Sequence, residues 1–176
     1  MIGIDIIDHS YSFRNSKYTL EHYKSRILNK TEFCFCENWN DLDRAWAIKE
    51  SAYKNHFKKT GSYFINPKRI LIVSLDLTTR KFVVEVEQSY YTGSFVDTGE
   101  YVYAVCGDKE PVKLFLHKSN NAKSIAEIPQ YLAQSNLEYH PEGFPEFVVY
   151  GASKYAYSRS HHGNYYISAM SEFSHN

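Results

Sequence analysis

The sequence lacks long apolar runs and contains few cysteines. None of its uncharged apolar stretches approaches the roughly 20 residues that a helix needs to cross a bilayer, so we expect no membrane partner. Residues 1–8 have no basic region and no small-residue cleavage site, and therefore predict no secretory signal. Cys34, Cys36 and Cys106 are odd in number and lack the spacing of a zinc site or a disulfide framework. This usage is typical of reduced thiols, and we expect a cytoplasmic protein.

A net charge is also absent, because 20 Lys and Arg balance 20 Asp and Glu among the 176 residues. This balance argues against a general polyanion binder, and we expect no nucleic-acid partner. The charges are nevertheless segregated along the chain. Between Arg44 and Arg69 there are seven basic residues and one acidic residue, whereas 124–153 contains four Glu and no Lys or Arg. A basic segment of this kind favours an anionic ligand or an acidic protein partner.

Hydrophobic and aromatic residues, in contrast, are plentiful. They make up 43% and 16% of the chain, with 16 Tyr and 11 Phe. This content excludes a disordered chain, and the length favours one domain over residues 1–176. An alternative is a module that stacks sugars or single-stranded nucleic acid on exposed aromatics. Most of the aromatic residues recur at core positions of the expected helices and strands, which favours a packed core instead.

The hydrophobic pattern predicts an α+β fold. Residues 2–7 read as a buried strand, and residues 41–58 as a helix that Asn40 or Asp41 would cap and Gly61 would end. The remaining expected elements are two short helices within 17–38, strands at 69–75, 81–87, 101–106, 112–117, 147–150, 153–158 and 164–170, and a helix over 121–137 that Pro129 would shorten or kink. The sequence itself shows no internal repeat.

Asp5 is the one polar residue in the middle of the first strand. A carboxylate in a buried strand is costly unless it is paired or binds a metal. The alternative is that Asp5 faces solvent at the end of the strand. The strand by itself does not separate these two interpretations.

Two further patterns contain candidate functional residues. On the expected helix, Glu50 and Lys54 are four residues apart and share a face, and Lys58 extends that face. Such a series is also typical of a solvated helix surface. Near the C-terminus, Ser160-His161-His162-Gly163 reads either as a polar surface turn or as a metal site, although two adjacent turn residues rarely converge on one ion.

The strand with Asp5, the helix with Glu50 and Lys54, and the Ser160-His161 turn follow one another in this order along the chain. In this order and spacing the chain resembles the 4'-phosphopantetheinyl transferases, specifically the small holo-acyl-carrier-protein synthase type. The segments that carry the resemblance are Ile2-Gly-Ile-Asp5-Ile-Ile-Asp8, Arg26 to Glu32 with Cys36-Glu37, Trp46-Ala-Ile-Lys49-Glu50-Ser-Ala-Tyr-Lys54, and Tyr157 to Ala169. The resemblance implies a single-copy fold in which an antiparallel sheet packs against a long helix. Residues 76–146 would then be an atypical insertion, because no motif of the family falls there.

The resemblance also implies an activity. The protein would transfer 4'-phosphopantetheine from coenzyme A to a serine of an apo acyl or peptidyl carrier protein, with Mg²⁺ as cofactor, and release adenosine 3',5'-bisphosphate. The carrier would belong to fatty acid, polyketide or peptide synthesis. The alternative is a catalytically inactive homologue that still binds coenzyme A or a carrier protein.

Site residues follow from the resemblance position by position. Asp5 and Glu50 would be the metal ligands, and Glu50 would also take the proton of the serine. Lys49 and Lys54 would bind diphosphate oxygens, and Ser160 and His161 the nucleotide end of coenzyme A. The catalytic set would thus be Asp5, Glu50 and Lys54. Asp8, where the small type usually has Glu, would support the site as a structural acid.

The small type also implies a homotrimer, in which the Ser-His turn of one subunit completes the site of its neighbour. A monomer would need to close the site with its own chain.

Overall fold

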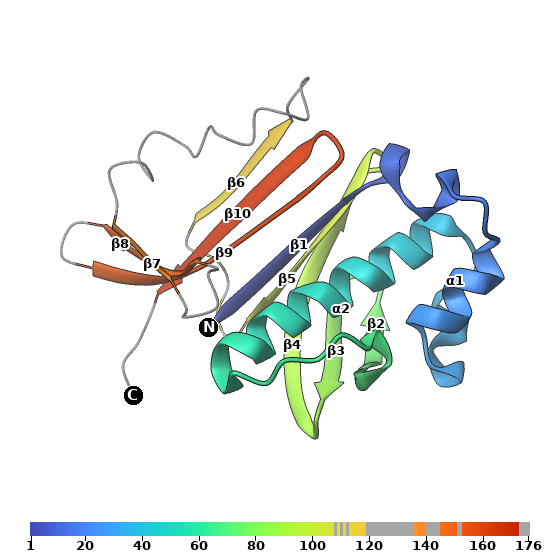
Figure 1. The fold of residues 1–176 in the computed structure, drawn as a ribbon, viewed down its shortest axis with the longest axis horizontal. Helices are drawn as coiled ribbons and strands as arrows, with labels where there is room; N and C mark the ends of the chain where they lie inside the picture. The colour runs from blue at the N-terminus through green and yellow to red at the C-terminus, as the bar shows by residue number, and fades with distance from the viewer. Residues whose placement is uncertain are drawn as a thin grey trace.

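The computed structural model describes residues 1–107, 109, 111, 113–118, 136–139, 145–150 and 153–172. In that part of the chain the protein forms two five-stranded antiparallel sheets and two α-helices (Figure 1). The α+β class expected from the sequence is therefore confirmed. None of the helices in the described part is long and apolar enough to span a membrane.

The first sheet, sheet A, holds the N-terminal strand and a meander. Its strand order is β1-β5-β4-β3-β2, and all its neighbouring strands are antiparallel. The bounds are Ile2–Asp8 for β1, Ile70–Asp76 for β2, Lys81–Val86 for β3, Ser89–Asp97 for β4 and Tyr101–Gly107 for β5. Because side chains alternate along a strand, one face of β1 is available to the helices and the other to the second sheet.

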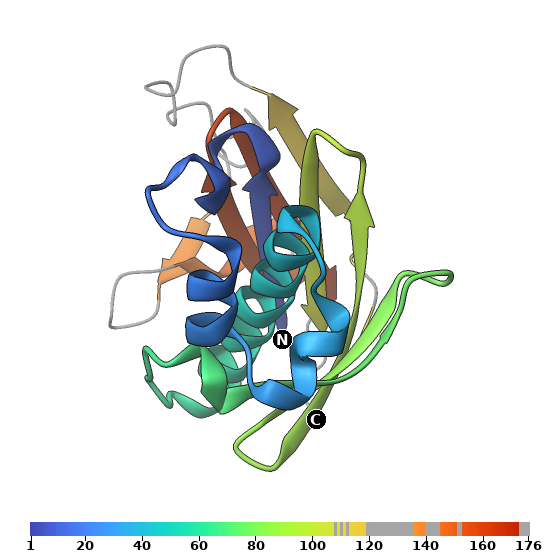
Figure 2. The same cartoon turned by 90° about the vertical axis from the view of Figure 1, so that its right-hand side faces the viewer.

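Helix α2 (Trp39–Thr60) covers one face of sheet A (Figures 1 and 2). It begins earlier than expected, because Asn38 rather than Asn40 or Asp41 is the N-cap and accepts a hydrogen bond from the backbone N–H of Asp41. It ends at Gly61, whose φ of 69° is the left-handed conformation that favours glycine. α2 contacts β1 and β5 most extensively.

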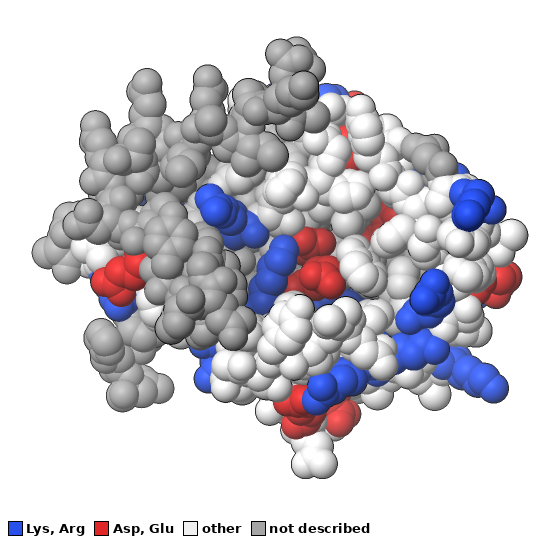
Figure 3. All heavy atoms as spheres, viewed as in Figure 1, with Lys and Arg blue, Asp and Glu red and all other residues white. Residues whose placement is uncertain are grey.

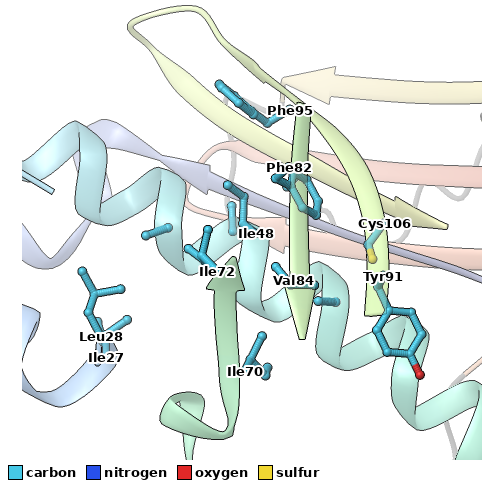
Figure 4. Packing of buried hydrophobic residues seen from close by; sticks show 14 of the residues in the cluster. Ile27, Leu28, Ile48, Ile70, Ile72, Phe82, Val84, Tyr91, Phe95 and Cys106 are labelled. Atoms are coloured by element: carbon cyan, nitrogen blue, oxygen red, sulfur yellow. The ribbon is translucent and has the colours of Figure 1, made fainter. Parts of the chain in front are cut away.

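The main hydrophobic core lies between α2 and sheet A (Figure 4). Ile48 of the helix meets Val84 and Phe82 of β3 in this cluster, and all three side chains are buried. Helix α1 (Leu20–Ile27) adds Ile27. Of the two short helices expected within 17–38, α1 is one, and Lys30–Phe35 forms a 3₁₀ helix in place of the other.

Strand β4 is absent from the sequence-based expectation, and it contains a glycine, Gly93. The structure shows why glycine stands there: a Cβ atom at Gly93 would lie 2.2 Å from the carbonyl oxygen of Val105 and 2.3 Å from the ring of Phe82. The glycine thus permits close packing inside the sheet instead of marking a turn.

The second sheet, sheet B, repeats the topology of the first. Its order is β6-β10-β9-β8-β7, so in each sheet the first strand pairs with the fifth and the other strands follow in reverse order. The bounds are Lys113–Lys118 for β6, Asn136–Tyr139 for β7, Pro145–Tyr150 for β8, Ser153–His162 for β9 and Tyr165–Glu172 for β10.

This repeat corrects the expectation of a single-copy fold with one sheet. The stretch 76–146, expected as an insertion, supplies strands to both sheets, including β3, β4, β5 and β6. Most of the helix expected over 121–137 lies outside the described residues.

β1 lies where the two sheets meet (Figure 1). Ile2, Ile4 and Ile6 form a second buried cluster with Ile167 and Ala169 of β10. Asp5 and Ile7, on the other face of the strand, point to the side of α2. One strand thus joins both halves of the molecule.

Side chains also cover the outer edge of β1. The hydroxyl of Ser158 accepts from the N–H of Ile4 at 3.1 Å, and Nδ1 of His162 accepts from the N–H of Asp8 at 3.1 Å. The ammonium groups of Lys54 and Lys58 donate to the carbonyl oxygens of Ile4 and Ile2, both at 3.0 Å. These bonds hold β9 and α2 at fixed positions along β1.

Candidate functional site

The candidate site is built around the buried carboxylate of Asp5, which is 6% exposed. Its Oδ1 accepts a hydrogen bond from Nζ of Lys54 at 2.6 Å and another from Oγ of Ser160 at 2.6 Å. These three residues come from β1, α2 and β9, so a strand, a helix and a hairpin from distant parts of the chain converge on one oxygen. The solvent-facing alternative for Asp5 is therefore wrong.

Glu50 lies one helical turn before Lys54 and faces the same side of α2. Burial and, to a smaller extent, the negative charge of Asp5 raise the pKa of Glu50 to about 7, although the positive charge of Lys54 opposes this shift. Glu50 accepts no hydrogen bond from the described part of the chain. Two neighbouring carboxylates thus share one ammonium group, which leaves negative charge for a cation to neutralise.

The surface view agrees with this arrangement. Acidic side chains gather near the centre of the face on which α2 crosses β1, and basic side chains lie beside them (Figure 3). The solvated-ladder interpretation of the helix therefore does not hold for Lys54, whose ammonium group reaches across to β1.

The two histidines of the β9–β10 hairpin take different positions. His162 lies two residues beyond Ser160 on the same face of β9, and its ring bonds to the backbone of β1. His161 has the opposite orientation and is exposed. The structure thus brings Ser160, but not His161, into contact with Asp5.

Asp8 anchors the same hairpin. Its Oδ2 accepts from the backbone N–H of Asn164 at 3.0 Å, and its Oδ1 accepts from the N–H and hydroxyl of Ser10. Burial would raise the pKa of Asp8, but these hydrogen bonds outweigh burial and lower it. The lowered pKa favours the ionised form of Asp8 at the turn.

Lys49 is not part of this cluster, although it precedes Glu50 in the chain. Its side chain is 1% exposed and pairs with Glu32 at 2.8 Å, while also donating to the carbonyl oxygens of Pro67 and Ile70. Burial lowers the pKa of Lys49, and Glu32 opposes that shift. With its donors engaged inside the protein, Lys49 cannot bind the diphosphate oxygens expected of it.

A pocket of about 370 Å³ is lined largely by aromatic side chains, and its lining residues neighbour those of the carboxylate cluster along the chain. Its walls include Ile7, Trp46 and His162. Each of these residues lies on the same face of its element as a residue of the cluster. Ile7 is two residues from Asp5 along β1, His162 is two residues from Ser160 along β9, and Trp46 is four residues from Glu50 along α2. A ligand reaching the carboxylates from this side would therefore contact an apolar surface.

A second polar network, which the sequence analysis missed, lies at the end of β1. His9 is 3% exposed, and its two ring nitrogens lie 2.8 Å from Asp43 and 3.4 Å from Asp97. Burial would lower the pKa of His9, but the two carboxylates raise it to about 9. A charged imidazole therefore ties β1 to α2 and β4, and stiffens the strand that holds Asp5. His9 directly follows Asp8, and only this adjacency could have indicated it.

The donor set fits a hydrated Mg²⁺. Asp5 and Glu50 offer oxygen ligands only, and no group of three or more His, Cys, Asp or Glu suited to a metal occurs within the described ranges. Mg²⁺ commonly takes one or two protein carboxylates and completes its shell with water and substrate phosphate. The shortage of positive charge between Asp5 and Glu50 agrees with such an ion.

Comparison of the chain with models of known protein families and with curated proteins finds no match in either set.

Ser160 of the same chain reaches Asp5, a contact that the resemblance would give to the Ser-His turn of a neighbouring subunit. We therefore expect a monomer instead of the homotrimer that the resemblance implies. Size-exclusion chromatography with light scattering should give a mass near 20.6 kDa. A mass three times larger, with activity lost on dilution, would show that the neighbouring subunit is required after all.

Proposed function

We propose that the protein is a 4'-phosphopantetheinyl transferase, which moves the phosphopantetheine group of coenzyme A to a serine of an apo carrier protein. One observation carries the proposal: Asp5, Glu50, Lys54 and Ser160, which match three separate motifs of that family, converge on one site. The two-sheet repeat supports a variant in which one chain holds the whole site.

In this proposal Asp5 and Glu50 would hold Mg²⁺, which would supply positive charge to neutralise the diphosphate of coenzyme A. The serine oxygen of the carrier attacks the phosphorus next to the pantetheine. The bond from that phosphorus to the bridging oxygen breaks, and adenosine 3',5'-bisphosphate leaves with the electron pair. Glu50 accepts the serine proton, for which a carboxylate in this position is suited.

Lys54 contributes positive charge where the leaving oxygen becomes negative. Its ammonium group is held between the Ile4 carbonyl and Asp5, with the side chain 27% exposed, so it is both fixed and accessible. Fixed charges of this kind stabilise the transition state because they do not reorganise during the reaction. The nucleotide phosphate would contact His161, as the resemblance implies, and the aromatic pocket would take an apolar part of a substrate.

The direct test is a mass measurement on the carrier. The protein is incubated with coenzyme A, Mg²⁺ and a panel of apo carrier proteins from fatty acid, polyketide and peptide synthesis. We expect one class of carrier to gain the mass of phosphopantetheine, and the gain to disappear with EDTA. Carriers whose serine is replaced by alanine serve as controls.

The inactive-homologue alternative makes a different prediction. Coenzyme A or a carrier would still bind, as measured by calorimetry, but no carrier in the panel would change mass. That combination would overturn the proposed transfer and leave a binding function.

A further inference from the structure

The hydrogen bonds of Asp5 are distributed unevenly between its two oxygens. Both Lys54 and Ser160 donate to Oδ1, and no hydrogen bond from the described residues reaches Oδ2. In a metal-binding carboxylate, a bond to one oxygen fixes the direction of the other. Oδ2 is thus the oxygen of Asp5 that is available to a cation.

Ser160 is well placed to orient the carboxylate of Asp5, because β9 is hydrogen-bonded to β1 both before and after Ser160. Ser158, two residues before, bonds to the N–H of Ile4, and His162, two residues after, bonds to the N–H of Asp8. These two contacts fix the register of β9 along β1. The hydroxyl of Ser160 therefore meets Asp5 without any rearrangement of the hairpin.

We infer that Ser160 is a positioning residue for the metal ligand Asp5, and not a ligand of the nucleotide phosphate. This inference rests on the proposed function, in which Asp5 holds Mg²⁺. Ser160, in strand β9 of sheet B, would then control the cation affinity of a site whose carboxylates belong to β1 and α2. His161, which is exposed, keeps the nucleotide role by itself.

The test measures cation binding without any nucleotide. Free Mn²⁺ is followed by electron paramagnetic resonance during titration of the full chain and its variants. We expect Ser160→Ala to weaken Mn²⁺ binding by roughly 10-fold, the usual effect of losing a hydrogen bond to a metal ligand. Ser160→Thr keeps the hydroxyl and should restore most of the affinity. Ser153→Ala, on the exposed start of β9, is the matched control and should change nothing.

A second measurement separates the two roles of Ser160. Coenzyme A and dephospho-coenzyme A differ only in the 3'-phosphate, and their binding is compared by competition. We expect Ser160→Ala to keep the preference for coenzyme A and His161→Ala to lose it. If Ser160→Ala instead keeps its Mn²⁺ affinity and loses this preference, the positioning role is wrong.

The wild-type protein gives the remaining outcome. The inference requires that the wild-type protein binds Mn²⁺ and that Asp5→Asn abolishes this binding. A wild-type protein that binds no Mn²⁺ would overturn the inference together with the proposed metal site. Failure of every carrier to gain mass, with Mn²⁺ binding intact and dependent on Ser160, would overturn only the transfer activity. Thermal unfolding of each variant shows whether the hairpin has remained folded.

Discussion

Glu50→Gln should abolish transfer to the carrier and, at the same time, stabilise the metal-free protein above pH 7. Transfer should fall by at least about 100-fold, because in the proposed mechanism Glu50 is both a metal ligand and the group that accepts the serine proton. Stability should rise because burial, together with the negative charge of Asp5, raises the pKa of Glu50 from 4.5 to about 7 in the folded protein. Its ionisation costs the folded state free energy as the pH rises from 4.5 to 7, and glutamine does not ionise.

The stability gain is measured by urea denaturation with EDTA at pH 5 and pH 8.5. We expect the variant to gain about 2 kcal/mol over wild type at pH 8.5 and little at pH 5, given about 1.4 kcal/mol per pKa unit and the partial exposure of Glu50. Glu37→Gln, at an exposed glutamate, is the control. Equal stability of Glu50→Gln and wild type at both pH values would show that neither burial nor Asp5 makes the ionised form of Glu50 unfavourable.

Lys49→Met should cost about 3–5 kcal/mol of unfolding free energy, because it leaves the carboxylate of Glu32 buried without its cation. Glu32 is 0% exposed and also accepts from the backbone N–H groups of Asn29 and Ile72. It therefore links α2 to the 3₁₀ helix before it and to β2. Urea denaturation at pH 7 measures the loss.

Two further variants test whether the loss of stability comes from the buried Lys49–Glu32 pair. Lys59→Met, at an exposed position of the same helix, should have little effect. The double variant Lys49→Met/Glu32→Gln removes both charges and keeps an acceptor for the backbone donors, so it should recover part of the stability. If Lys49→Met instead keeps full stability and weakens coenzyme A binding, Lys49 serves the diphosphate as the resemblance implies.

The sequence predicts best what depends on local periodicity. The four-residue spacing of Glu50 and Lys54 determines that they share a face of α2, and alternation along β1 places Asp5 on the side of that helix. The same reasoning fails for Lys49. Only the tertiary position of Glu32, 17 residues earlier in the chain, shows that Lys49 points into the core.

The repeated topology was beyond sequence reasoning for a different reason. Two halves with the same strand order need only similar alternation of apolar residues, and β1 and β6 share no distinctive residues. Gly93 further conceals β4, because a strand glycine resembles a turn signal. The position of Ser160 on Asp5 depends on how the two sheets meet, which no local pattern contains.

The covered edge of β1 also affects how the protein avoids aggregation. A strand with free N–H and C=O groups is a template for pairing with other chains. On β1 the carbonyl of Ile4 is occupied by Lys54, the same ammonium group that bonds to Asp5. A substitution at Lys54 chosen to study catalysis therefore also opens a strand edge, and its loss of activity must be separated from self-association by light scattering.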